Sequence, residues 1–494
     1  MTDRAPLPRS SGGAWTPGRR LLTAGLVLLV TAGAFEGLAV PTVLPATLAE
    51  LRGLELYGWA FSSFWLSSLV GIALAGAEAD RRGPLAPLVA GMLAFAAGLL
   101  VAGLATSMAW VVAGRVIQGL GAGAIAAITY VAIARGYAPA AQPRMIAVIS
   151  SAWVLPGIVG PALAGWLSEE LSWRWAFIGL APVLPLAALA VAIPLARFPP
   201  VRPAPAVGDA ASSLPSRRAA VAAVGDSLAL AIGAGALLSA PGWGNALAAA
   251  AAAIAGIALV WRPLRRLLPS GTLTASSRRG AAVATLALVS VAFLGTEAFV
   301  PLAVASVRNA GTIAGGLALT AAAVTWATGS WLQARVAERR SRASVTLAGL
   351  VLIGVGIALV AAVPITSLPP VALAATAWAV AGLGMGLAYS TTTLVVIESA
   401  QPGSEGAASA SAQLANTLGI ALGTGAAGAI VAASASSPLG LAPGILLADA
   451  LMLIVAVLAI AAARRMGVAP AGPDEAGVTT SGLAPADRGP GLSP

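Results

Sequence analysis

The chain has little charge and lacks three residue types that carry much of protein chemistry. It contains no cysteine, no histidine and no lysine, and only 9% of its 494 residues are charged. These absences exclude disulfides and thiolate metal sites, remove the commonest metal ligand, and exclude a Gly-x-x-x-x-Gly-Lys-Ser/Thr nucleotide-binding loop. Any proton chemistry must therefore use carboxylates. We predict a protein with no metal site and no cofactor.

Apolar residues dominate what is present. Hydrophobic residues make up 58% of the chain and the mean hydropathy is +0.90. The charged fraction of 9% is far below the roughly 25% of soluble domains. The hydrophobic residues are grouped in long runs. They form blocks of about 20 or more residues, enough to cross a hydrocarbon layer roughly 30 Å thick, without the alternation of barrel strands. The sequence thus predicts an all-α, polytopic membrane protein with 14 transmembrane helices. The expected spans are 21–45, 56–78, 84–106, 108–134, 144–168, 173–196, 219–240, 243–262, 280–303, 311–335, 343–364, 370–397, 405–433 and 440–463.

The arginines orient these spans. If the chain begins in the cytoplasm, 24 of its 28 arginines fall in cytoplasmic segments, whereas Arg52, Arg174 and Arg308 fall outside and Arg115 lies within a span. Because basic residues gather in cytoplasmic loops, we predict a multi-pass protein of the cell membrane with both termini in the cytoplasm. The net charge of +10 then reflects topology, so we expect no nucleic-acid partner.

Two longer basic loops divide the spans into groups of six, two and six. The two groups of six begin alike, because Glu36 is followed by Pro41 and Glu297 by Pro301 near the outer end of the first helix. Such internal similarity is typical of transporters built from two related halves. The expected parts are a disordered cytoplasmic tail (1–18), an N-terminal six-helix bundle (19–197), a cytoplasmic loop (198–218), two extra transmembrane helices (219–263), a second cytoplasmic loop (264–279), a C-terminal six-helix bundle (280–465) and a disordered cytoplasmic tail (466–494).

The first motif is the hairpin GAEADRRGPLAP at 76–87, which resembles the Gly-x-Leu-Ala-Asp-Arg-x-Gly-Arg-Lys loop of the major facilitator superfamily. Gly76, Asp80, Arg81 and Gly83 match, whereas Glu78, Pro84 and Leu85 depart from the pattern. The resemblance implies a loop that holds one bundle against the other, with an ordinary charged turn as the alternative. The Asp80 carboxylate is expected to accept hydrogen bonds from a helix N-terminus or a guanidinium.

The second motif, GRVIQGLGAGA at 114–124, resembles the Arg-x-x-Gln-Gly-x-Gly-x-Gly pattern of the fourth helix in the same superfamily, with Arg115, Gln118 and Gly119 matching. A guanidinium costs about 3 kcal/mol at a helix centre on insertion scales, so Arg115 needs a partner or a watery cavity. At about 1.5 Å per residue, Arg115 and Glu36 lie at similar depths and can meet. The resemblance to drug exporters implies that this acid and arginine take part in proton coupling, with a purely structural buried ion pair as the alternative.

The third motif is PGIVGPALAG at 156–165, which resembles the fifth-helix pattern Gly-x-x-x-Gly-Pro-x-x-Gly-Gly of the antiporter branch. Gly157, Gly160, Pro161 and Gly165 match, and Ala164 departs. Small residues let helix backbones approach closely, and membrane packing tolerates a proline bend. We expect a bent helix against which the opposite bundle moves, although a merely kinked packing helix remains an alternative. Together with AFEGLAVPTVLP at 34–45 and WRWAF at 173–177, the motifs resemble the fourteen-helix drug:proton antiporter subfamily.

Three further acids fall within apolar spans, where ionisable residues are functional candidates by default. Glu297 joins Glu36 and Arg115 as a proton-coupling candidate because of the repeat, with simple hydration near the outer edge as the alternative. Asp226 lies in the extra helices and is not expected to take part in the cycle, and Asp449 has no assigned role.

The resemblance implies a secondary antiporter that uses protons to export a small amphipathic compound by alternating access, as in multidrug efflux. Two alternatives keep the fold: a dedicated exporter of an endogenous metabolite or lipid, and an importer. We expect no enzyme, because no histidine, cysteine or lysine is available for a catalytic cluster. The expected partners are a small-molecule substrate, protons and membrane lipids, and the expected state is a monomer.

Overall fold

The computed structural model describes residues 19–137, 141–196, 217–242, 245–336, 339–400 and 405–467, and these residues are helical with no β-strand. The expected tails and most of the 198–218 loop lie outside the described residues. The helices are α1 (Arg20–Leu51), η1 (Leu54–Leu56), α2 (Trp59–Arg82), α3 (Leu85–Gly103), α4 (Met108–Gly136), α5 (Gln142–Ser151), α6 (Val154–Glu170), α7 (Trp175–Ile178), α8 (Val183–Leu195), α9 (Arg217–Ser239), η3 (Ala240–Gly242), α10 (Ala246–Leu267), α11 (Arg278–Glu297), α12 (Val300–Leu302), the π-helix η4 (Ala303–Val307), α13 (Gly311–Val336), α14 (Arg342–Val360), α15 (Pro370–Glu398), α16 (Glu405–Ala435), α17 (Leu441–Arg464) and η5 (Arg465–Gly467).

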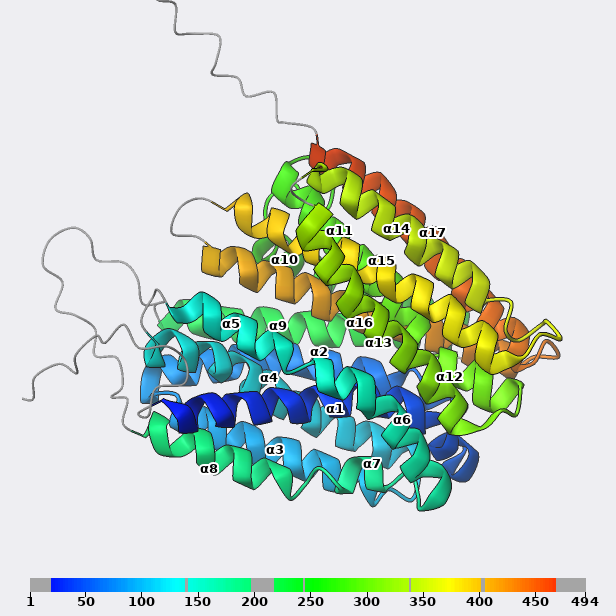
Figure 1. Ribbon diagram of the computed structural model, residues 1–494, viewed down its shortest axis with the longest axis horizontal. Helices are drawn as coiled ribbons and strands as arrows, with labels where there is room; N and C mark the ends of the chain where they lie inside the picture. Colours follow the sequence, from blue (N-terminus) through cyan, green and yellow to red (C-terminus); the bar gives the residue numbers. More distant parts are fainter. Residues whose placement is uncertain are drawn as a thin grey trace, which may run out of the picture.

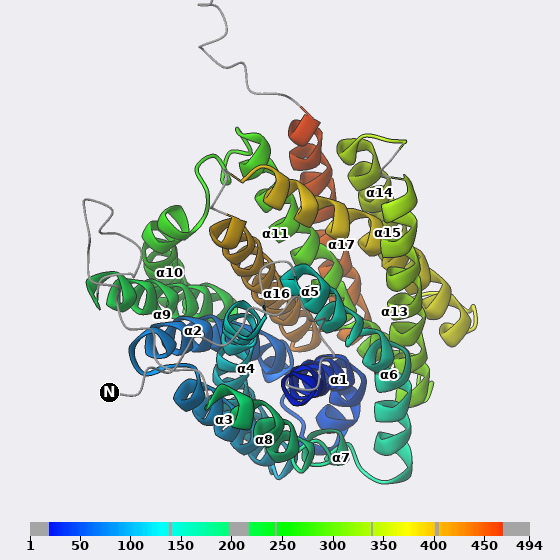
Figure 2. The same cartoon turned by 60° about the vertical axis from the view of Figure 1, so that its left-hand side comes forward.

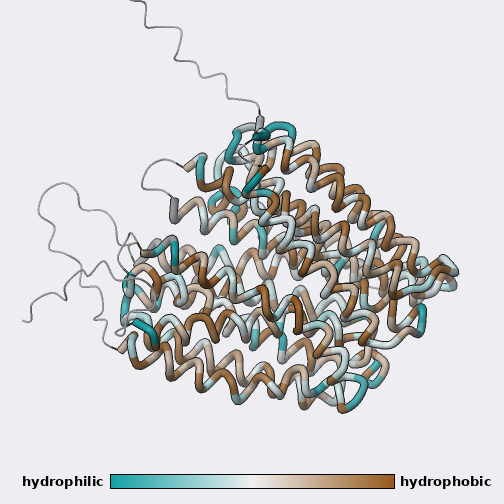
Figure 3. Tube along the Cα trace, viewed as in Figure 1, coloured by the Kyte–Doolittle hydropathy of each residue, from teal (hydrophilic) through white to brown (hydrophobic). Residues whose placement is uncertain are grey.

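Fourteen segments among the described residues are long and apolar enough to cross a membrane, which confirms the predicted number of spans. Figure 3 shows hydrophobic residues along the helices and hydrophilic residues gathered towards their ends. This pattern is the one expected where lipid surrounds the middle of each helix and water meets the ends.

Three spans that the sequence predicts as single helices are interrupted. Proline has no N–H for the carbonyl four residues earlier, and its ring clashes with that carbonyl. Pro156, Pro182 and Pro301 lie four residues after Ala152, Ile178 and Glu297, and α5, α7 and α11 end at or next to these positions. By contrast, α6 continues through Pro161, so the helix break near the third motif precedes the motif instead of lying within it.

The helices form two bundles and a separate pair. Figures 1 and 2 show α1–α8 together, α11–α17 together, and the α9–α10 pair beside α2 and α16. In the N-terminal bundle α4 packs on α2 and α3, and in the C-terminal bundle α15 packs on α13 and α14. Helix α6 contacts both α1 of its own bundle and α13 of the other.

The chain begins and ends its membrane crossings at the same end of the molecule, because the number of spans is even. We call this the arginine-rich end and the other the opposite end, where Arg52, Arg174 and Arg308 lie.

The two bundles meet through helix segments towards the opposite end, where their ribbons converge in Figure 1. We call the following contacts the closure: Tyr57 with Ala298 and Phe299, Gly58 with Gly428, and Gly165 with Thr312 and Ile313. A methyl group at Gly58 would lie 2.7 Å from the Cα of Gly428, so these backbones touch directly. The closure therefore joins the bundles at the end away from the chain termini.

Candidate functional site

The structure brings Glu36 of α1 and Arg115 of α4 into direct contact in the N-terminal bundle. Their side chains are 1% and 3% exposed, and the guanidinium donates a hydrogen bond to Oε1 of Glu36. Arg115 also donates to the Ala60 carbonyl (2.8 Å) and to Oε1 of Gln118 (2.9 Å), and it lies over the ring of Phe64, 4.1 Å from the centroid. A buried guanidinium is tolerated only with such partners, because charge and donors must be compensated inside the membrane.

Two polar atoms at this pair have no partner among the described residues. Oε2 of Glu36 and Nε2 of Gln118 are buried and make no hydrogen bond. Because buried polar groups are normally paired, an unpaired carboxylate oxygen needs a physical account. Oε1 holds the guanidinium, which leaves Oε2 free to accept a proton or a donor from water or a ligand.

The second motif brings α2 and α4 together at this pair. A Cβ added at Gly119 would lie 2.0 Å from the Ser67 hydroxyl oxygen and 2.2 Å from the Phe64 carbonyl oxygen, so no side chain fits there. This close approach positions the Ala60 carbonyl and the Phe64 ring of α2 against the Arg115 guanidinium.

The third motif lies on the face of α6 that meets α13. A methyl group at Gly165 would lie 2.8 Å from the Cα of Ile313, and one at Gly157 would lie 3.1 Å from the Ala323 side chain. Pro161 contributes its carbonyl oxygen to the same contact, and Gly160 faces Phe35 of α1 instead. Three of the four motif residues therefore form part of the contact between the bundles.

We expect alanine at Gly316 of α13 to weaken the contact between the bundles. Its methyl group would lie 2.4 Å from the Pro161 carbonyl oxygen, a backbone atom that cannot turn aside, and such overpacking costs about 1–3 kcal/mol. The Thr320 hydroxyl donates to the Ile158 carbonyl across the bundles (3.4 Å), so single cysteines placed at these two positions report on the contact. Disulfide cross-linking between them should slow about tenfold in Gly316→Ala. The matched control is Gly354→Ala, where a methyl group meets nothing within 4 Å. Unchanged cross-linking in Gly316→Ala would contradict this account.

The first motif does not hold the bundles together in this structure. Asp80 is exposed and has no hydrogen bond or ion pair among the described residues, contrary to the expected acceptor role. Glu78, which departs from the family pattern, takes the arginines instead, 2.8 Å from Arg82 and 3.7 Å from Arg81. Gly83 has φ of 89°, which explains glycine at this turn, whereas Gly76 has open space around it.

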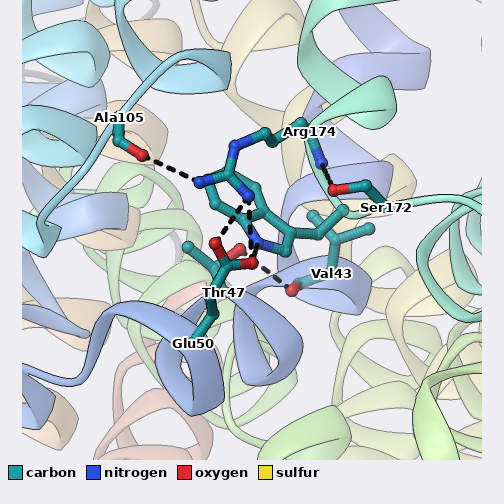
Figure 4. A network of polar contacts seen from close by, with 7 residues as sticks. Val43, Thr47, Glu50, Ala105, Ser172 and Arg174 are labelled. Carbon is teal, nitrogen blue, oxygen red and sulfur yellow. Dashed lines mark hydrogen bonds and ion pairs between the residues drawn. The ribbon is translucent and has the colours of Figure 1, made fainter.

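Two acids at the opposite end were not singled out from the sequence. Figure 4 shows the Arg174 guanidinium between the Ala105 carbonyl (3.2 Å) and the Glu50 carboxylate (2.7 and 2.9 Å). Trp173 donates to the same carboxylate (2.8 Å) and is 3% exposed, so it does not face the lipid boundary. The WRWAF segment thus ties α7 to the end of α1.

The second acid, Glu169 at the end of α6, contacts the other bundle. Its Oε1 accepts hydrogen bonds from the backbone N–H of Ile313 (2.8 Å) and the Thr312 hydroxyl (3.1 Å), at the N-terminus of α13. A negative charge is favourable there because unpaired N–H groups and the helix dipole point towards it. No motif marks this residue, because its partner is more than 140 positions away in the chain.

We expect Glu169→Gln to favour separation of the bundles at the closure. Removing the charge from an exposed carboxylate at a helix N-terminus costs about 1 kcal/mol, which is roughly a fivefold change in the equilibrium. Spin-label distances across the closure should show the larger separation more often. Glu170→Gln is the matched control, because this neighbouring acid is exposed and has no described partner. An identical distance distribution in Glu169→Gln and wild type would refute the role of this contact.

The remaining acids within the spans have different surroundings. Glu297 accepts a hydrogen bond from the Trp378 indole (3.1 Å), and Asp449 lies beside the hydroxyl of Thr296; these side chains are buried. Asp226 lies 3.7 Å from Arg266 within the α9–α10 pair, away from both bundle interiors. The described residues contain no group of three or more Asp or Glu residues suited to a metal ion.

The comparison with known families identifies the fold. The sequence profile described as Major Facilitator Superfamily matches residues 25–424. The chain belongs to this superfamily. A chain with 14 candidate membrane spans among its described residues fits that family, which is a transporter family and not an enzyme family.

Individual relatives and a solved structure similar to this chain are also named as transporters or transporter homologues. A protein named probable multidrug-efflux transporter from Mycobacterium tuberculosis is 27% identical over 474 residues, covering 93% of this chain and 97% of the relative. The multidrug transporter protein MdtP of Bacillus subtilis is 28% identical over 174 residues, 35% of this chain and 32% of the relative. The fold is similar to that of a bacterial homologue of the human lysosomal transporter Spinster, with a TM-score of 0.64, 16% identity and coverage of 91% and 98%.

Proposed function

We propose that this superfamily member is a proton-coupled antiporter that exports a small amphipathic compound by alternating access. The observation that carries the proposal is the buried Glu36–Arg115 pair with one carboxylate oxygen unpaired. The family and the multidrug-efflux names of its relatives support the transport of small molecules.

The pair offers a way to exchange a proton for a substrate. Ionised Glu36 neutralises Arg115, and a proton added to Oε2 removes that neutralisation without first breaking the hydrogen bond at Oε1. The uncompensated guanidinium then disfavours the same arrangement of α1, α2 and α4, because an unpaired buried charge is costly. A bound substrate and a bound proton therefore compete through one charge.

The proposed orientation assigns the arginine-rich end to the cytoplasm and the closure to the outer side of the cell membrane. The contacts of the closure then belong to the state open to the cytoplasm, and separation of the bundles at the closure gives the outward-open state. In this scheme the protein works as a monomer, and the membrane lipids cover the exposed apolar faces of the helices.

Transport by purified protein in proteoliposomes tests the proposal. An imposed pH gradient should drive accumulation of at least one amphipathic compound against its own gradient, with protons moving in the opposite direction. Collapse of the gradient by a protonophore should stop accumulation, and a panel that includes metabolites and lipids separates multidrug export from a dedicated exporter. Accumulation that follows protons in the same direction would establish an importer and refute the proposal.

A further inference from the structure

The C-terminal bundle has a break in its first helix at a buried acid. Helix α11 ends at Glu297, and the same membrane span continues through α12 and a π-helix to Val307. Pro301 supplies no N–H for the Glu297 carbonyl, so the regular helix stops there. Interruptions and π-helical turns within spans recur where a membrane protein binds an ion or a substrate.

A second acid lies close to this break. Gly295 of α11 allows close packing, because a methyl group there would lie 2.8 Å from the sulfur of Met452 on α17. Asp449, one turn before Met452, lies near the hydroxyl of Thr296, which is buried and makes no hydrogen bond among the described residues. Asp449 is 3% exposed and Glu297 9% exposed, so both carboxyl groups are shielded from water.

These two acids lack the compensation that Glu36 has. Among the described residues, neither acid has an arginine within 4.0 Å, and the six salt bridges of the described chain include neither. The arginine of α11 closest to Glu297 is Arg279, 18 residues earlier, which is about 27 Å along a helix. Arg308 at the opposite end donates to the carbonyls of Val363 and Leu368 instead.

The surrounding helices add no other charge at this depth. The only charged residues of α15 and α16 are Glu398 and Glu405, at the arginine-rich ends of these helices. Towards α15, the Trp378 indole that donates to Glu297 stacks on Phe293, with 4.8 Å between ring centroids. The titratable group facing the break from the other bundle is Tyr57, whose hydroxyl donates to the Ala298 carbonyl (3.3 Å).

We propose that Glu297 and Asp449 form a second proton-binding centre, in the C-terminal bundle, that opens to the outer side when the closure separates. Two ionised carboxylates without a cation are strongly disfavoured inside a membrane, whereas two carboxylic acids are compatible with the hydrogen bond from the Trp378 indole and with the uncharged, unpaired hydroxyl of Thr296. The proposal rests on the proposed antiport in one respect only: the released protons then add to the one exchanged at Glu36.

Tyr57 links this centre to alternating access. Its ring lies against Phe299 with 5.3 Å between centroids, and both side chains are almost fully buried. These contacts, one and two residues after Glu297, belong to the closure and cover the break on the side of the N-terminal bundle. Separation of the bundles removes Tyr57 and exposes the break, so protons enter the centre from the outer side.

Infrared difference spectroscopy of the full-length protein in lipid tests proton binding without any transport. Wild type should show carboxylic-acid C=O bands that disappear on alkalinisation, and Glu297→Gln and Asp449→Asn should each remove a part of them. The two changes are nearly isosteric, and size-exclusion chromatography verifies folding. Glu36→Gln is the reference, because it should leave these bands in place even if the proposed antiport is wrong.

Bands identical in wild type and both variants would overturn the proposal. Loss of the bands when sodium replaces choline at constant pH would also overturn it, because it would identify a metal cation as the ligand. In proteoliposomes, either variant should retain gradient-driven flux. The limiting substrate ratio, which is the steady-state ratio of substrate concentrations on the two sides of the membrane, should fall about tenfold at a gradient of one pH unit, as expected for one proton fewer per cycle. An unchanged limiting ratio with full flux would overturn the part of the proposal that concerns transport.

Discussion

Replacing Glu36 by glutamine is expected to reduce gradient-driven flux to the level of protein-free liposomes while the protein stays folded. Glutamine has nearly the same shape and can still accept the hydrogen bond from Arg115, but it cannot bind and release a proton. A proton gradient shifts a conformational equilibrium only through a group whose proton affinity differs between the two states. Glutamine at position 36 therefore removes the proton-binding group through which the proposed exchange of substrate for a proton takes place.

The measurement compares the two proteins in proteoliposomes with the same imposed pH gradient and a compound that wild type accumulates. Asp226→Asn is the matched control, because Asp226 is also an acid within a span but lies in the α9–α10 pair beside Arg266. It should retain wild-type flux. Coupled flux that survives in Glu36→Gln would refute Glu36 as the site where substrate is exchanged for a proton, and would leave Glu297 and Asp449 as the groups that couple transport to the gradient.

Replacing Arg115 by alanine is expected to destabilise the N-terminal bundle by about 3–5 kcal/mol, because it leaves the Glu36 carboxylate buried without a cation. The change also removes the donors to Ala60 and Gln118 and the contact with the Phe64 ring. Lysine at this position should recover only part of the loss, since an ammonium cannot match the planar fork of the guanidinium.

A double substitution separates the buried charge from the lost packing. Replacing both Glu36 and Arg115 by methionine removes both charges together, and uncharged replacements of buried ion pairs are often neutral or stabilising. Unfolding in mixed micelles should therefore show the double variant well above Arg115→Ala in stability, although its coupled flux should be absent. A double variant as unstable as the alanine variant would mean that packing, and not the unpaired charge, explains the loss.

The sequence alone determined the fold class, because a long apolar block can satisfy its backbone within a membrane only as a helix. It also predicted the contact between Glu36 and Arg115, since two opposite charges at similar depth in an apolar medium have few other partners. The glycine motif at 156–165 correctly indicated close packing, because only small residues permit backbone contact.

Other features could not be predicted from local pattern. The hydrogen bonds of Glu169 to α13 depend on where two distant segments meet. The surroundings of the Asp449 side chain likewise depend on Thr296, which lies on another helix. The exchange of roles between Asp80 and Glu78 depends on the direction in which two side chains leave one short turn. Pro301 breaks its helix whereas Pro161 does not, although both lie in apolar spans.

The chain order of apolar and charged residues thus determined which segments cross the membrane and which buried charges need a partner. These properties follow from the cost of transferring each group into lipid, which is a property of the residue itself. Only the tertiary structure decided which acids obtained an arginine, which obtained a neutral donor, and which end of the molecule holds the two bundles together. Those outcomes depend on distances between helices far apart in the chain, and no local pattern encodes such distances.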